Sequence, residues 1–144
     1  MKGFIVGLTA REKEEFIINV GERYEIDKYE EIETGFRFFT ELYNTSQFCE
    51  DYMKTPIYEV EAYGFVENTD INNLYVTDKI EVLRIVPFEE IKQYYWLHKD
   101  EIANCRRDNW YARRQMVLFG IEPEQFADHW CHHVRSAVAN NERY

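Results

Sequence analysis

The chain has 144 residues, 45% of them apolar and 17% aromatic, so it is long enough for one domain and apolar enough to bury a core. Its formal net charge of −10 disfavours nonspecific attraction to nucleic acids or anionic membranes, which needs a positive surface. No apolar run approaches the roughly 18 residues that cross a bilayer, and the start lacks a secretory signal, so we expect a cytoplasmic protein. Three cysteines, an odd number at wide spacing, are expected to stay reduced.

Short strands are predicted through the first 86 residues, because runs of β-branched and aromatic residues there are bounded by glycine or polar turns. Phe16–Val20 and Arg23–Ile26 flank Gly21-Glu22, a pair that suits a turn, and are therefore expected to form a hairpin. Thr40 is expected to cap one short helix, which Pro56 ends. The remaining predicted strands are Lys2–Leu8, Phe36–Phe39, Ile57–Val66, Leu74–Thr77 and Lys79–Val86.

The hydrophobic period changes at Pro87 from two residues to between three and four, which predicts helices over the rest of the chain. The first is expected over residues 88–104. The second is expected from about residue 106 to Phe119, before Gly120, a favoured residue immediately after a helix. A third is expected to begin at Pro123, which suits a first helical position. Its apolar stripe recurs at four-residue steps, at Phe126, Trp130, Val134 and Val138.

Strands followed by helices define an α+β fold, in which a mostly antiparallel sheet packs one face on its helices. We expect residues 1–87 to form a β-rich domain with one short helix. Residues 88–144 are expected to add two or three helices packed on that domain, as one compact unit. The charges are divided in a similar way, because residues 1–100 carry 11 Lys and Arg against 21 Asp and Glu, whereas residues 101–144 carry six of each sign.

Five blocks between residues 1 and 88 carry a family resemblance through their order and spacing: Met1–Phe4, Val20–Glu25, Glu33–Phe39, Tyr58–Gly64 and Thr77–Val82. They resemble a family of domains of unknown function common in phage and prophage genomes (DUF7666-like). The resemblance implies a phage-type protein that acts in the host cell cytoplasm. Members of the family carry a Cys and a His where this chain has Thr34 and Arg37, so any chemistry of that pair is expected to be lost here.

Glu59 and Glu61 place two carboxylates on one face of a predicted strand, about 7 Å apart. Such a pair can divide acid and base roles between its members. The segment from Gly35 to Val66 is also similar to ADP-ribosyltransferase-like folds, in its succession of a glycine–aromatic strand, a helix and a Tyr-x-Val strand. That similarity implies a catalytic role for the two glutamates. The alternative interpretation is a solvated sheet face.

His129 and His133 lie four residues apart, so on a continuous helix they share a face and can hold zinc. Cys105 or His98 would have to supply a third ligand. The catalytic glutamate of the H-E-x-x-H motif is missing, since Trp130 follows His129. The alternative is a polar helix face beside the apolar stripe.

Arginine and aromatic residues alternate around the predicted second helix, at Arg106, Arg107, Trp110, Tyr111 and Arg114. These residue types are enriched where interfaces are tightest, so the set predicts a partner-binding surface. We expect Arg107, Tyr111 and Arg114 to face outward, and Met116 or Val117 to pack inward. The alternative is a solvated face with arginine stems lying over aromatic rings.

The sequence contains no nucleophile elbow, phosphate loop, dinucleotide fingerprint or C-x-x-C motif, so no cofactor is expected and binding is favoured over catalysis. With the phage resemblance, this favours an accessory protein that binds and inhibits a host or anti-phage defence protein, of which CRISPR effectors are one kind. The alternative is an ADP-ribosyltransferase-like enzyme or an NAD-binding relic.

Two further groups of residues suggest a kind of binding partner. An acidic run suggests a mimic of phosphates that occupies the basic groove of a nucleic-acid enzyme, or else simple solubility. A set of aromatic residues beyond residue 88 suggests self-association as a homodimer. The acidic run is Glu12, Glu14, Glu15, Glu22, Glu25, Asp27, Glu30, Glu31 and Glu33, and the aromatic set is Tyr94, Tyr95, Trp96, Trp110 and Tyr111.

Overall fold

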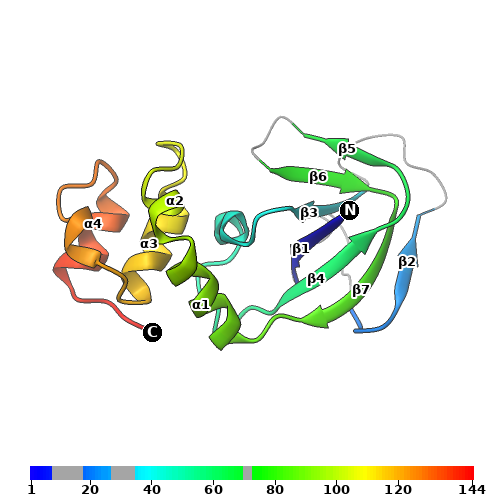
Figure 1. Ribbon diagram of the computed structural model, residues 1–144, viewed down its shortest axis with the longest axis horizontal. Helices are drawn as coiled ribbons and strands as arrows, with labels where there is room; N and C mark the ends of the chain where they lie inside the picture. Colours follow the sequence, from blue (N-terminus) through cyan, green and yellow to red (C-terminus); the bar gives the residue numbers. More distant parts are fainter. Residues whose placement is uncertain (8–17, 27–34, 70–72) are drawn as a thin grey trace. The chain divides into compact units, whose positions relative to one another are not determined.

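The computed structural model describes residues 1–7, 18–26, 35–69 and 73–144 (Figure 1). They divide into two compact units, Met1–Pro87 and Phe88–Tyr144, at the position where the hydrophobic period changes. The strands lie in the first unit and the α-helices in the second, which confirms the α+β class. Within the described residues, no helix has the length and apolar character needed to cross a membrane.

The strands of the first unit form one antiparallel sheet, in the order β2-β7-β4-β1-β3-β6-β5. The central strand β1 pairs on one side with β4 and on the other with β3, so that Phe4 lies opposite both Glu59 and Phe39 (Figure 1). The bounds are β1 Lys2–Val6, β2 Arg23–Glu25, β3 Phe36–Phe39, β4 Ile57–Ala62, β5 Val66–Asn68, β6 Leu74–Thr77 and β7 Lys79–Ile85.

Alternating residues of these strands form the core of the first unit. Val60 and Ala62 of β4 are buried, as the two-residue period predicts, whereas Glu59 and Glu61, which alternate with them, are half-buried. The same alternation buries Phe36 and Phe38 on β3. The core cluster consists of Ile5, Phe36, Phe38, Val60, Ala62, Ile80 and Val82.

The predicted strand Ile57–Val66 is wrong beyond Ala62, because the chain bends at Gly64 and resumes as β5. At the bend, the carboxylate of Asp78 accepts the N–H of Phe65 at 2.9 Å. A Cβ on Gly64 would lie 2.1 Å from that carboxylate, so only glycine fits. Since β4 pairs with β7 and β5 with β6, the four strands are the two arms of one long hairpin, bent at this corner.

The predicted hairpin of Phe16–Val20 with Arg23–Ile26 is wrong for its described part. Residues 18–20 are not a strand, and residues 16 and 17 lie outside the described residues. Instead, β2 pairs with β7, with Arg23 opposite Glu81. Gly21 has a φ of 87° and donates its N–H to the carbonyl of Val82 at 2.8 Å, and the N–H of Val82 donates to the carbonyl of Glu22 at 2.9 Å, so the turn attaches to β7.

The helix predicted between Thr40 and Pro56 is shorter than expected. It is the 3-10 helix η2, Leu42–Gln47, and it begins after Glu41 rather than Thr40. Within it, the hydroxyls of Thr45 and Ser46 donate to the carbonyls three residues earlier, at 2.6 and 2.7 Å. These local bonds favour a tight turn over an α-helix.

The second unit contains α1 Phe88–Leu97, α2 Lys99–Ala103, α3 Trp110–Leu118, the 3-10 helix η3 Pro123–Phe126 and α4 His132–Ala139. The helices differ from those predicted in three places. The first helix is divided at His98, the second begins at Trp110 rather than at residue 106, and the third is broken over residues 127–131. Pro123 does open η3, and Met116 and Val117 are both fully buried, as predicted.

The end of α3 is as the glycine pattern predicts. Gly120 has a φ of 72° and donates its N–H to the carbonyl of Val117 at 2.9 Å, while Ile121 donates to that of Met116 at 2.9 Å. These two bonds form a Schellman motif, which satisfies carbonyls that the helix leaves without partners.

Gly3→Ala tests how tightly the central strand is packed. A Cβ there would lie 2.3 Å from a ring carbon of Phe38 and 2.7 Å from the carbonyl oxygen of Phe39. We expect the free energy of unfolding in urea to fall by about 2 kcal/mol, because neither the sheet backbone nor the buried ring can yield cheaply. Lys2→Ala, on the exposed side of the same strand, is the control and should keep its stability, and a Gly3→Ala protein as stable as the wild type would show that β1 tolerates a larger residue.

Candidate partner-binding surface

Two loops of the helical unit, one before α3 and one before α4, meet at Trp130. The indole Nε1–H of Trp130 donates to the carbonyl of Arg107 at 3.1 Å. The guanidinium carbon of Arg107 lies 5.2 Å from the centroid of the Trp130 ring, within the range of a cation–π interaction. Trp130 nevertheless remains 47% exposed. We call Arg106, Arg107, Asp108 and Trp130 the arginine–tryptophan surface; together they line a cavity of about 400 Å³.

Arg113 holds the first loop from beneath. The residue is 6% exposed. Its guanidinium donates to the carbonyls of three consecutive residues: Cys105, Arg106 at 3.1 Å and Arg107 at 3.3 Å. A planar group with five N–H donors can serve several acceptors in this way, whereas an ammonium group cannot match the geometry. The backbone that carries Arg106 and Arg107 is therefore fixed from inside the unit.

The second loop is held by Arg135 of α4. Its Nη1 donates to the carbonyls of His129 and Trp130, at 2.7 and 2.9 Å. The N–H of Cys131 donates to Nδ1 of His129 at 3.0 Å. The backbone on both sides of Trp130 is thus fixed, which orients the exposed indole.

The structure places the residues of the predicted partner-binding set in different surroundings. Arg106 and Arg107 are exposed but precede the helix on which they were placed. Trp110 stacks on Tyr111 with ring centroids 4.0 Å apart, and on His133 at 4.9 Å. Arg114 instead forms an ion pair with Glu142 at 3.8 Å. Sequence reasoning missed Trp130 and Arg113.

The structure does not assemble the predicted metal site. His129 precedes α4 and His133 lies within it, so the two do not share a helix face. Nε2 of His129 lies 3.4 Å from the guanidinium of Arg113, and the Cys105 thiol donates to the carbonyl of Ile102 at 2.9 Å. Among the residues with described positions, no three His, Cys, Asp or Glu side chains converge on a point that a metal ion could occupy.

Ionisation at this site follows from burial and neighbouring arginines. Burial lowers the pKa of His129, and the positive charges of Arg113 and Arg135 lower it further. Burial raises the pKa of the Cys105 thiol, against the opposing charge of Arg113. A neutral imidazole and a protonated thiol are therefore favoured, which is the opposite of an activated cysteine–histidine pair.

The carboxylate pair on β4 is engaged in ion pairs. Glu59 lies 3.4 Å from Nη2 of Arg84, and Glu61 lies 2.9 Å from the amino nitrogen of Met1. His98, the other metal ligand considered, faces Glu101 at 3.1 Å. These contacts give each side chain a structural partner.

The other two predicted surfaces are described only in part. Of the acidic run, Glu22 and Glu25 are exposed, and Glu25 accepts the hydroxyl hydrogen of Tyr63 at 2.9 Å. The remaining acidic residues, Glu12, Glu14, Glu15, Asp27, Glu30, Glu31 and Glu33, lie outside the described residues. In the aromatic set, Tyr95 is fully buried, contrary to the prediction, whereas Trp96 is 52% exposed.

Comparisons with protein-family models, with curated proteins and with solved structures found no match to this chain. Its function must therefore be inferred from its own residues. In the arginine–tryptophan surface, exposed arginine and tryptophan side chains lie on backbone that the buried Arg113 holds in place.

Arg113→Lys tests that support. Lysine cannot match the geometry of three consecutive carbonyls, so these partly buried carbonyls would lose the donor they share and the free energy of unfolding should fall by about 2 kcal/mol. The indole N–H resonance of Trp130 should shift as the Arg107 carbonyl moves. Arg114→Lys is the matched control on the same helix, and an Arg113→Lys protein as stable as this control would contradict the role.

His129 predicts a pH dependence of stability. Because its pKa is lowered in the folded state, the unfolded chain binds a proton first as the pH falls through about 6.5. The free energy of unfolding should therefore decrease below that pH, and His129→Gln should reduce the decrease. Urea titrations at pH 7.5 and 5.5 would give the free energy of unfolding of the wild type and of the variant at each pH. If both proteins lose the same free energy of unfolding between these two pH values, this assignment is contradicted.

Proposed function

We propose that this is a phage-type accessory protein that acts by binding another protein, and that it inhibits a host or anti-phage defence protein. The observation that carries the binding function is the half-exposed Trp130, oriented beside Arg107 at the edge of a cavity. Tryptophan and arginine are the residue types that most often contribute large binding energies at protein interfaces. The phage context comes from the resemblance of residues 1–88 and implies action in the host cytoplasm.

The surface is ordered before any partner arrives, which supports a binding role. The Trp130 N–H has its acceptor in the Arg107 carbonyl, and the Arg107 guanidinium is stacked on the same ring. Both side chains therefore lose little conformational freedom on association, and immobilising such side chains is one of the main costs of binding.

The charges of the surface indicate the chemistry of the partner. No carboxylate among the described residues pairs with Arg107, and Arg106 faces only the exposed Asp108, at 3.6 Å. Arginine can bind a carboxylate through two parallel N–H donors. A partner segment with an acidic residue for Arg107 and an apolar residue for the face of Trp130 would complement this surface.

Other residues support binding over catalysis. Glu59 and Glu61, the proposed acid–base pair of the alternative enzyme, each contact a positive group. The raised pKa of Cys105 disfavours its thiolate, the form that acts as a nucleophile.

Arg107→Ala tests the proposal in a capture experiment from bacterial lysate at low and at physiological salt. We expect a reproducible partner, and a loss of about 2 kcal/mol of binding free energy, or roughly thirtyfold in affinity. The melting temperature should stay nearly unchanged, because the contacts of Arg113 are to the backbone of residue 107 rather than to its side chain.

Arg114→Ala is the matched control, since its side chain pairs with Glu142 and does not line the cavity. Equal affinity of the Arg107 variant and the wild type would contradict the assignment of this surface. The absence of any reproducible partner at either salt would contradict the function itself.

A further inference from the structure

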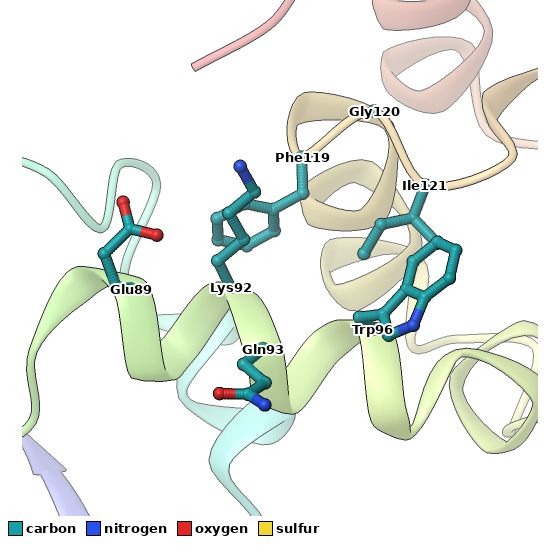
Figure 2. A pocket seen from close by; sticks show the side chains of 7 residues that line it. All are labelled: Glu89, Lys92, Gln93, Trp96, Phe119, Gly120 and Ile121. Atoms are coloured by element: carbon teal, nitrogen blue, oxygen red, sulfur yellow. The ribbon is translucent and has the colours of Figure 1, made fainter.

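A second hollow lies in the helical unit, between α1 and the turn that follows α3. Figure 2 shows it as a groove with Glu89 at one end and Trp96 at the other. Its volume is about 500 Å³, within the range of pockets that hold small molecules. Its walls are formed mainly by Trp96, Phe119 and Ile121, with Lys92 between the two ends (Figure 2).

The groove follows from the pattern of α1 and from the glycine after α3. Ile91 and Tyr95 are buried on one side of α1, so Lys92 and Trp96, at other positions around the helix, form a separate face. Gly120 lines the groove without a side chain, and a Cβ there would meet Arg143 only at 3.6 Å. The turn at Gly120 therefore adds no side chain to the groove.

Trp96 is held in place although it is 52% exposed. The ammonium of Lys99 lies 3.9 Å from the centroid of its ring, and the same ammonium lies 3.8 Å from a carboxylate oxygen of Glu122. This contact connects the indole to the segment just beyond the α3 turn. A large flat ring thus forms a fixed wall at the same end of the groove as Ile121 (Figure 2), as a stacking surface for an aromatic ligand requires.

The charge of the groove selects the class of ligand. Across the described part of the chain, no carboxylate lies within ion-pair distance of the Lys92 ammonium. Glu89 also lines the groove, but Figure 2 places it at the end away from Trp96. We infer that the groove binds a small aromatic carboxylate, with its ring between Trp96, Phe119 and Ile121 and its carboxylate against Lys92. This site is independent of the arginine–tryptophan surface.

The test uses 2-naphthoate as the probe and uncharged 2-naphthamide as its matched analogue. The chain has three tryptophans, so a heteronuclear spectrum of the full-length protein reports Trp96 in the groove, Trp130 at the other surface, and Trp110. We expect naphthoate to shift the Trp96 indole resonance selectively. Its Kd should be about fivefold lower than that of naphthamide, the effect of one ion pair near a surface.

Lys92→Gln should remove this fivefold preference while leaving the binding of naphthamide unchanged. Lys54→Gln carries the same charge change at a side chain that is 83% exposed in the other unit, and should keep the preference. Equal affinities of the two compounds for the wild type would overturn the ligand class. Shifts confined to Trp110 or Trp130, or no shift of Trp96 at millimolar probe, would overturn the site.

Discussion

The buried guanidinium of Arg113 is the interaction on which the surface of the helical unit depends. Three carbonyls in a row, at residues 105 to 107, point to one planar group instead of to water. The Arg106 carbonyl also accepts the N–H of Asn109 at 3.0 Å, and the Arg107 carbonyl accepts the indole N–H of Trp130, so the guanidinium is the donor common to all three carbonyls. These bonds hold the loop before α3 in the arrangement that brings the Arg107 carbonyl within reach of Trp130.

Much of the fold was predictable because strand patterns are local. The bounds of β3 and β6 agree with the prediction, and β7 differs only at its last residue, since β3 and β6 are short, mostly apolar runs and β7 alternates apolar with polar residues over its first half. Gly120 and Pro123 were predicted correctly because a left-handed φ and a missing N–H restrict the positions they can occupy. The bend at Gly64 was not predictable, because its cause is Asp78, which lies 14 residues further along the chain.

The candidate site was predicted in part. Arg106 and Arg107 were recognised from their residue type, but Trp130 was assigned to a buried stripe because its four-residue spacing from Phe126 and Val134 matches a helix. That helix is broken over residues 127–131, and the break exposes the ring. Arg113 and Arg114 are adjacent and chemically identical, so no local pattern separates the buried arginine from the one paired at the surface. The distinction comes from the three carbonyls of residues 105 to 107, which the folded loop turns toward Arg113.

The pairing of β1 has a consequence for synthesis of the chain. Both neighbours of β1, the strands β3 and β4, come later in the sequence, and the register with β4 reaches Glu61. While the ribosome is still adding these residues, β1 has no strand to pair with, although it already carries the apolar side chains of Phe4 and Ile5. The bent hairpin of β4 to β7, by contrast, consists of consecutive segments and requires only short loops to close. A nascent chain therefore presents its central strand to solvent and to chaperones until the segment through β4 has emerged.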